Sequence, residues 1–407
     1  MANSIQGTND DGTVVVVVGG GPAGLTAAIA LATAGVPTIL SAGRPQQDNR
    51  TTALLVSSVT ALETLGIWSL CADRAAPLRV MRIVDASKRL LRAPEVRFEA
   101  AEIGLEAFAY NIENRHLLEA LSTSARALPH LQWIEGAVEH IEVNESHASL
   151  LLSDGREIAV PLVIGADGRG SLCRQAAGIQ SDERRYPQTA LTFNLQHTRP
   201  HREISTEFHT ESGPFTLVPL PGNRSSLVCV VSPSDADRLC SLPDPELAAE
   251  LERRSHSILG KIRIESRPSS FPLVMQTAER FAENRIALIG EAAHALPPIG
   301  AQGLNLGLRD AATITEIAVA ARRNGEDPGA PEVLERYNTA RRLDVSSRAF
   351  GVDLLNRSLL SGFLPLHGAR GFGLFLLDRI APLRRAVMRE GVQPSAAQPR
   401  LMLGEAL

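Results

Sequence analysis

The sequence predicts an α/β fold, because segments typical of a strand, a glycine-rich turn and a helix occur on both sides of a β-rich middle. The first such segment, TVVVVVGGGPAG at 13–24, places five consecutive valines before glycines spaced G-x-G-x-x-G. The second segment, at 285–322, has the same order of elements. Between them, residues 188–231 contain the alternating apolar pattern of β-strands. We therefore expect a discontinuous Rossmann-like domain with a β-rich domain inserted into it.

The valine run at 14–18 indicates a strand buried on both faces, and residues 25–35 indicate the helix that follows it. In this arrangement the glycines allow a tight turn, close approach of a pyrophosphate, and close packing of the helix on the strand. The helix N-terminus adds free N–H groups and a positive dipole end. A dinucleotide site is thus predicted, and a purely structural glycine-rich turn remains the alternative. The expected phosphate-binding residues are Gly19, Gly21, Pro22, Ala23 and Gly24.

Ser41 ends the second expected strand, at 36–41. An acidic residue usually stands at that strand end and binds the ribose hydroxyls. A serine hydroxyl can also bind a ribose, but without the charge-assisted strength of a carboxylate. We therefore expect Ser41 at the ribose, weak retention of the dinucleotide, and tighter binding when a glutamate replaces the serine.

Several further elements are expected from local patterns. Helices are predicted over 52–65, over 114–128 with Asn114 as N-cap, and over 247–259. The turn at Asp154-Gly155 predicts a hairpin that joins 148–152 to 158–164.

Charge and cysteine content exclude some function classes. The formal net charge of −4 over 407 residues gives no general attraction to nucleic acid. The four dispersed cysteines, without a C-x-x-C, predict small core residues in a reducing, cytoplasmic setting, and we expect no metal site. The uncharged stretch 12–43 is interrupted by glycines and a proline, so we interpret it as a buried βα unit rather than a membrane span.

The C-terminal region, 346–407, is expected to be helical. From 341 onward the chain carries ten arginines and five acidic residues, with apolar runs between them. This composition fits either a packed helical cap or an amphipathic surface that contacts lipid, which would place the protein peripherally on the inner membrane face. The stretch 359–377 is too interrupted by proline, glycine and polar residues to span a membrane.

Three motifs together carry a resemblance to a known family: GGGPAG at 19–24, VIGADGRGSLCR at 163–174, and the long motif at 287–311. The chain resembles the class A FAD-dependent aromatic hydroxylases with the para-hydroxybenzoate hydroxylase fold, most of all the hydroxylases of ubiquinone biosynthesis. Segments 50–68 and 109–121 resemble the same group.

The resemblance implies FAD as cofactor and NAD(P)H as co-substrate. It implies that NAD(P)H reduces the flavin, that O2 then forms a flavin C4a-hydroperoxide, and that this species hydroxylates the ring of a prenylated phenol. It assigns no catalytic side chain. Besides the glycine motif and Ser41, it implies FAD contacts for Arg50, Asn114, Asp167, Gly168, Gly290, Glu291, Pro298, Gly300, Gln302, Gly303, Asn305 and Leu306.

The implied FAD-binding domain comprises 1–75, 105–180 and 275–345, and the implied β-rich substrate domain comprises 76–104 and 181–274. Two alternatives stay open: a flavin hydroxylase of a soluble aromatic acid, and a flavin-free scaffold of a biosynthetic complex. Membership of such a complex or a homo-oligomer also stays open.

Overall fold

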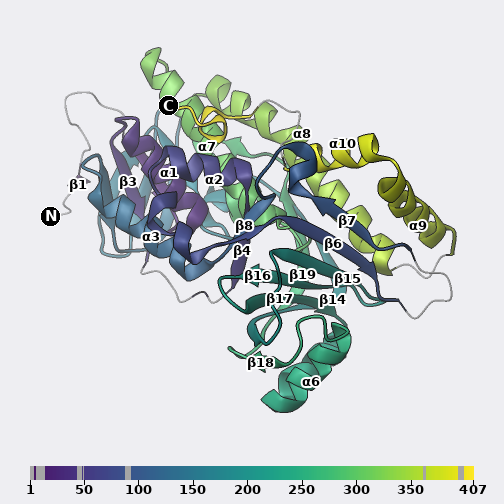
Figure 1. The fold of residues 1–407 in the computed structure, drawn as a ribbon. Coiled ribbons are helices and arrows are strands. Elements are labelled where there is room, and N and C mark those ends of the chain that lie inside the picture. Colours follow the sequence, from purple (N-terminus) through teal and green to yellow (C-terminus); the bar gives the residue numbers. More distant parts are fainter. Residues whose placement is uncertain are drawn as a thin grey trace.

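A computed structural model describes residues 4–5, 14–43, 48, 50–87, 93–360, 364–392 and 398–407. It confirms the predicted α/β class: a parallel sheet with its helices stands beside a large mixed sheet, and a helical C-terminal region lies along both (Figure 1).

The parallel sheet forms the centre of the nucleotide-type half. Its strands follow the order β20-β21-β13-β2-β3-β9, all parallel except β20 at one edge. Their bounds are Ala282–Glu283, Ile286–Leu288, Leu162–Gly165, Val15–Val18, Thr38–Ser41 and Leu131–Ile134. β2 is buried along its whole length, as the valine run predicts for an inner parallel strand.

Helices α1 (Pro22–Thr33), α3 (Asn114–Ala127) and α7 (Gln302–Arg323) pack beside this sheet. α1 and α7 approach each other closely at their first turns. A Cβ atom on Gly307 would lie 3.1 Å from Gly290 Cα and 3.4 Å from Ala23 Cβ. Small residues therefore bring the N-termini of the two helices to the same edge of the sheet.

A nine-stranded mixed sheet makes up most of the second half. Its main path is β22-β19-β14-β17-β16-β15-β6-β7, and β18 pairs with β14. In the same order the bounds are His294–Ala295, Ser269–Ala278, Ser181–His197, Arg224–Val231, Pro214–Leu220, Ile204–His209, Val80–Asp85 and Val96–Glu99, with β18 at Ile262–Ile264. The parallel pair β15–β6 joins segments 204–209 and 80–85, which lie far apart in the sequence.

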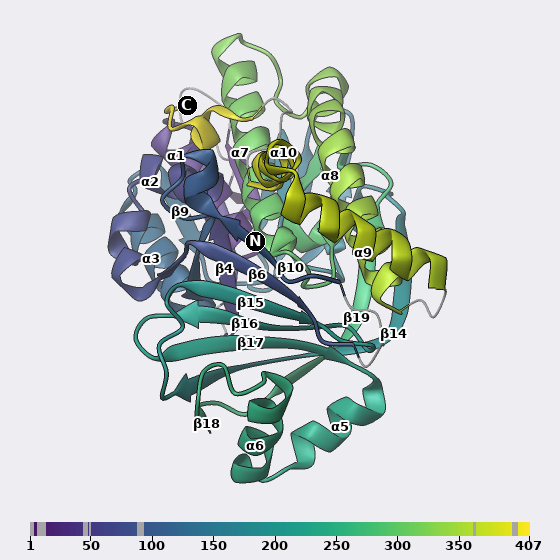
Figure 2. The same cartoon turned by 45° about the vertical axis from the view of Figure 1, so that its right-hand side comes forward.

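One face of this sheet packs on α5 (Pro233–Ser241) and α6 (Asp244–Arg254), visible below the strands in Figure 2. Leu191, Phe193 and Leu195 of β14 belong to the shared core with these helices. Because side chains alternate along a strand, Ala190 and Thr192 face the other way. The second face of the sheet is therefore not covered by α5 and α6.

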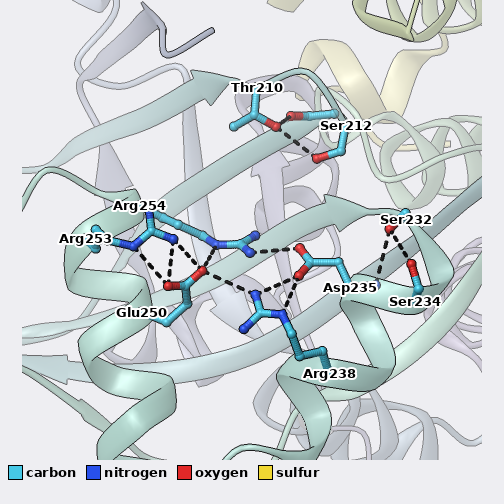
Figure 3. Close-up of polar contacts among 10 residues, drawn as sticks. Thr210, Ser212, Ser232, Ser234, Asp235, Arg238, Glu250, Arg253 and Arg254 are labelled. Atoms are coloured by element: carbon cyan, nitrogen blue, oxygen red, sulfur yellow. Dashed lines mark hydrogen bonds and ion pairs between the residues drawn. The ribbon is translucent and has the colours of Figure 1, made fainter. Parts of the chain in front are cut away.

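An ion-pair network joins α5 to α6 (Figure 3). Asp235 accepts hydrogen bonds from Arg238 at 2.7 Å and Arg254 at 2.8 Å. Glu250 binds Arg254 at 2.8 Å and Arg253 at 2.7 Å. Ser232 caps the start of α5 by accepting the N–H of Asp235. The two helices are therefore fixed to each other as well as to the sheet.

Two smaller sheets complete the strands. One has the order β4-β8-β5, at Thr51–Leu55, Ala109–Glu113 and Ala76–Leu78. The other has the order β1-β12-β11-β10, at Ser4–Ile5, Glu157–Val160, Ala148–Leu152 and Val138–Val143. Helix α2 (Val56–Thr64) follows β4, and helix α4 (Leu172–Ala176) follows the loop 166–171 after β13.

The C-terminal region contains α8 (Pro331–Leu360), α9 (Leu364–Arg379) and α10 (Ala381–Val392). α9 and α10 lie on the side of the large sheet opposite α5 and α6 (Figure 2). Met388 and Val392 of α10 pack on Val96, Phe98 and Phe108. Other apolar side chains of α9, of α10 and of the residue between them are exposed to solvent: Phe372, Phe375, Ile380, Leu383 and Val387. No helix in the described part of the chain is long and apolar enough to cross a membrane.

Three local predictions were wrong in detail. Residues 52–55 belong to β4 and not to a helix, because they pair with β8. Asn114 is the first residue of α3, and Glu113 occupies the N-cap position. The predicted strand 158–164 is divided at Pro161 into β12, which forms the expected hairpin with β11, and β13, which joins the parallel sheet.

Candidate active site

A cavity of about 700 Å³ lies between the glycine-rich loops and the free face of the large sheet. Its lining comes from the α1 and α7 N-termini, the strands of the large sheet and α10. Of the residues predicted for the site, those that line the cavity are Gly21, Pro22, Ala23, Gly24, Arg50, Asn114, Gly168, Gly290, Glu291, Pro298, Gly300, Gln302 and Gly303.

The glycines of the first loop serve different purposes. Gly19 has φ +118°, and a Cβ there would lie 2.2 Å from the carbonyl oxygen of Ala166. A Cβ on Gly24 would lie 2.1 Å from the carbonyl oxygen of Gly19. Gly21 has no protein atom within 4 Å of the Cβ position. Gly19 and Gly24 are therefore required by the protein's own packing, whereas Gly21 leaves open space in the cavity.

That open space lies at the N-terminus of α1. Gly21 is the N-cap and has no side chain with which to accept a hydrogen bond, and Pro22 follows as the first helical residue. The N–H groups of the first turn have no partner within the helix and carry its positive dipole end. An anionic group such as a pyrophosphate fits this position.

Arg50 and Asn114 meet at Asp48, a residue that the sequence analysis did not select. Asp48 accepts two hydrogen bonds from the Arg50 guanidinium, at 2.8 and 2.7 Å, and one from Asn114 Nδ2 at 2.8 Å. Partial burial alone would raise the pKa of Asp48, but these hydrogen bonds hold it below its ordinary value. Arg50 also lies over the ring of Phe271 in the large sheet, 5.5 Å from its centroid. Asp48 therefore orients Arg50 between the two halves of the cavity.

The two residues of the Asp167-Gly168 turn have different roles. Asp167 accepts the Ser171 hydroxyl at 2.6 Å and the Cys173 N–H at 3.0 Å, which fixes the start of α4, and it does not line the cavity. Gly168 lines the cavity with φ +79°. The next residue, Arg169, lines it as well and pairs with Glu291 at 3.2 Å. The turn therefore presents its backbone and Arg169, rather than its carboxylate, to the cavity.

The loop before α7 forms a second glycine-rich helix start. Gly300 and Ala301 both adopt left-handed backbone conformations, at φ +66° and +54°, directly before Gln302. Gln302 and Gly303 line the cavity at the first turn of the helix. Two helix N-termini thus face one cavity, and both favour negative charge.

Besides Asp167, four residues predicted for the site do not line the cavity: Gly19, Ser41, Asn305 and Leu306. Gly19 turns the chain beneath the helix start, and Leu306 is buried in α7. Asn305 is buried and fully hydrogen-bonded, to Leu55, Ser58, Ala53 and Ala301. Ser41 is only 2% exposed and donates its hydroxyl to the carbonyl of Gly136.

A buried ionic network stands behind the second loop. His294 lines the cavity, and its Nε2 lies 2.6 Å from Asp310. Asp310 also accepts the Gly290 N–H at 3.0 Å and Arg341 Nε at 2.7 Å. Burial alone would raise the pKa of Asp310, but His294 and Arg341 beside it keep the pKa below its ordinary value. Asp310 thereby fixes both the loop backbone and the histidine ring.

The free face of the large sheet forms the floor of the cavity. Its lining side chains come from successive strands: Phe271 and Leu273 of β19, Ala190 and Thr192 of β14, Val228 of β17, Thr216 and Val218 of β16, Ser205 and Glu207 of β15, and Met81 of β6. Phe98 of β7 and then Val387, Met388 and Val392 of α10 continue the lining. The floor thus extends from the glycine-rich loops to the C-terminal helices.

Comparison with known proteins agrees with this geometry. Residues 12–349 match the family model described as "FAD binding domain". Ubiquinone hydroxylase UbiL of Rhodospirillum rubrum is 36% identical over 98% of this chain and 95% of its own length. The 3-demethoxyubiquinol 3-hydroxylase of Escherichia coli is 31% identical over 93% of this chain and 97% of its own length.

A solved structure with a similar fold is p-nitrophenol 4-monooxygenase PnpA of Pseudomonas putida, with a TM-score of 0.76 and 19% identity over 95% of this chain and 100% of that one. The family match and the hydroxylase relatives support an enzyme rather than the flavin-free scaffold. The chain belongs to the FAD-binding-domain family and, within it, to the FAD-dependent aromatic-ring hydroxylases of ubiquinone biosynthesis.

Proposed function

We propose that the glycine-rich end of the cavity holds FAD and that the sheet-lined end holds the ring of a prenylated phenol, which is hydroxylated at the expense of NAD(P)H and O2. The observation that carries this proposal is one continuous cavity with two helix N-termini at one end and a mainly apolar floor at the other.

The residues present fit FAD. The open position at Gly21 and the free N–H groups after it suit the pyrophosphate, and the start of α7 suits the negative charge of a reduced flavin ring. Arg50, Asn114, Glu291 and the loop from Pro298 to Gly303 are the remaining groups that would contact the cofactor. When bound, FAD supplies the redox chemistry, and the protein positions the substrate and excludes water.

The charges of the cavity favour a neutral phenol over a soluble aromatic acid. An aromatic acid needs a cation near its ring, and the two arginines among the described lining residues are Arg50 and Arg169. Both arginines lie at the glycine-rich end of the cavity, where Arg50 pairs with Asp48 and Arg169 pairs with Glu291. Among the described side chains of the large sheet that line the cavity, the ionisable ones are Glu207, which would repel a carboxylate, and His294, which is already held by Asp310.

The C-terminal helices suggest how an apolar substrate reaches the cavity. Val387 both lines the cavity and is exposed to solvent, next to the exposed Leu383 and Ile380. Arg379, Arg385 and Arg389 are exposed on the same two helices. Apolar side chains interspersed with arginines suit contact with an anionic lipid surface. We infer that α9 and α10 rest on a membrane and that the prenyl chain enters the cavity beside α10.

Product analysis tests the function. FAD-loaded protein is incubated with NADPH, O2 and either 2-geranylphenol or 4-hydroxybenzoate, and the products are examined by mass spectrometry with 18O2. We expect one labelled oxygen in the ring of the geranylphenol. Hydroxylation of the benzoate alone would replace the prenylated phenol by a soluble acid, and no hydroxylation of either probe would contradict the proposal.

A further inference from the structure

We propose that Glu207 accepts the hydrogen of the substrate's ring hydroxyl, an inference that rests on the proposed function. Glu207 lies on β15, where Thr206 and Phe208 alternate with Ser205, Glu207 and His209. Phe208 belongs to the core beneath α6, so the alternation directs Glu207 to the opposite face. Ser205 and Glu207 accordingly both line the cavity.

The carboxylate of Glu207 is held from two sides. His209 Nε2 lies 2.8 Å from Oε1, and the hydroxyl of Thr216 on the neighbouring strand donates to Oε2 at 3.3 Å. An ionised carboxylate only accepts hydrogen bonds, so Nε2 of His209 carries the hydrogen of the first contact. Each carboxylate oxygen has further acceptor capacity. The Glu207 side chain is 22% exposed, while that of His209 is 4% exposed. Glu207 is thus fixed in place and still accessible.

Glu207 differs in its surroundings from the other acidic groups of the cavity. Asp48 is occupied by Arg50 and Asn114, and Glu291 is occupied by Arg169, all at the glycine-rich end of the cavity. On the neighbouring strands Glu207 stands opposite Ile83 of β6 and Thr216 of β16. The apolar lining residues Met81 and Val218 lie two residues further along those strands. Among the floor side chains named above, Glu207 is the carboxylate, and therefore the strongest acceptor for the hydroxyl of a ring that also carries an apolar substituent.

The hydrogen bond has a chemical consequence for the ring. As Glu207 takes the proton, the phenol O–H bond breaks, its electron pair stays on the oxygen, and Glu207 becomes a neutral carboxylic acid. The extra electron density reaches the ring carbons ortho and para to the oxygen, which are the carbons that an electrophilic oxygen attacks. For the ring to become aromatic again, the attacked carbon loses its hydrogen as a proton to solvent, the electron pair of that C–H bond returns to the ring, and Glu207 gives its proton back to the substrate oxygen. Glu207 is therefore both the acceptor that orients the hydroxyl and the base that activates the ring.

Two probes that differ only at the hydroxyl test this role: 2-geranylphenol and its methyl ether. Their Kd values are measured by the change in flavin fluorescence of the FAD-loaded protein. We expect the wild type to bind the phenol about tenfold to a hundredfold more tightly, because the ether has no hydrogen to donate to the carboxylate. In Glu207→Gln the preference should fall to a few-fold at most, and less hydroxylated product should form per NADPH consumed.

The matched control is Glu142→Gln, which removes the charge of a carboxylate that also contacts a histidine, His140, but on an exposed strand of the small sheet. It should keep the wild-type preference. Equal binding of the two probes by the wild type, or an unchanged preference in Glu207→Gln, would overturn the role of Glu207. The wild-type comparison decides this even if the variant does not fold. If the wild type binds neither probe, the proposed substrate class fails instead.

Discussion

At the scale of single residues, Gly21 and Gly24 belong to the same motif but have opposite requirements. We predict that Gly24→Ala destabilises the apoprotein by at least about 2 kcal/mol, because its Cβ would lie 2.1 Å from the Gly19 carbonyl oxygen. Gly21→Val should leave the apoprotein close to wild-type stability, since the Cβ position is open, and should abolish FAD binding. Urea unfolding of the apoproteins and FAD titration separate the two effects. Retained FAD affinity in Gly21→Val would place the pyrophosphate elsewhere.

Ser41 has surroundings that its position in the motif does not indicate. The sequence predicts tighter FAD binding for Ser41→Glu, but Ser41 is buried and its hydroxyl already donates to Gly136. We now expect Ser41→Glu to lower the free energy of unfolding by about 1–3 kcal/mol, because a longer charged group enters a filled site, and to weaken FAD binding. Ser41→Ala serves as the control and should cost about 1 kcal/mol, the loss of one hydrogen bond, without affecting FAD. Tighter FAD binding in Ser41→Glu would instead support the ribose contact that the sequence predicts for this position.

At the scale of elements, the buried network joins α7 to α8 through arginines and aspartates. Asp344 of α8 pairs with Arg309 of α7 and with Arg341 and Arg348 of its own helix. Arg348 also reaches Gln302, so the network ends at the first turn of α7 beside the cavity. Although burial opposes ionisation, the three arginines keep the pKa of Asp344 well below its ordinary value of 3.8.

We predict that Asp344→Asn lowers the free energy of unfolding by about 3–5 kcal/mol at pH 7, because it leaves buried guanidinium groups without their carboxylate. Since the folded-state pKa of Asp344 is depressed, its contribution is fully present above pH 3.8 and is lost as the pH falls through the folded pKa. The difference between wild type and variant should therefore be constant from pH 7 to 5 and narrow only below about pH 4.

Urea unfolding at each pH measures that difference. The exposed pair of Arg400 and Glu405 provides the control, since Glu405→Gln should change stability by less than about 1 kcal/mol at every pH. A difference that narrows already between pH 7 and 5 would show that another group titrates with the network.

The predictable elements are those whose signal is local. The βα units around β2 and β21 carry their glycines, apolar strands and helix starts in consecutive residues. β4 was mistaken for the start of a helix because its strand character comes from pairing with β8, more than fifty residues away in the sequence. A local pattern has no access to such a partner.

The same limit applies to the site. The cofactor-end loops could be selected from motifs, and most of them line the cavity. The floor could not, because it combines one face of several strands. The parallel pairing of β15 with β6, for example, places Ser205 opposite Met81 and Glu207 opposite Ile83. Asp48 was missed for a related reason: its importance lies in its contacts with Arg50 and Asn114, and no motif marks it.

At the scale of the whole molecule, the C-terminal helices have a packed side, as a cap requires, and exposed apolar side chains, on which the proposed lipid contact rests. α10 is packed through Met388 and Val392, so it is a cap over the sheet, while its Leu383 and Val387 side chains are exposed. Arg384 belongs to the packed side, because it pairs with Glu102 at 2.7 Å and donates to the Leu377 and Asp378 carbonyls. Arg384 is therefore unsuited to lipid contact, unlike Arg379, Arg385 and Arg389.

We predict salt-sensitive binding of the protein to vesicles of phosphatidylglycerol and phosphatidylcholine, measured by co-sedimentation. Each arginine near an anionic surface contributes about 1 kcal/mol, so replacing Arg379, Arg385 and Arg389 by Glu should weaken binding by about two orders of magnitude or more.

The triple change makes the net charge more negative by six, from −4 to −10. A control variant with the same net charge has Glu in place of the exposed Arg74, Arg126 and Arg253, which lie on other elements. The control should bind vesicles far better than the α9–α10 variant, and both should retain FAD. If the two variants lose vesicle binding equally, only the overall charge of the protein matters. If the wild type binds neutral and anionic vesicles with equal affinity, the arginines do not pair with lipid headgroups. In either case α9 and α10 would be a packed cap without a lipid-binding role.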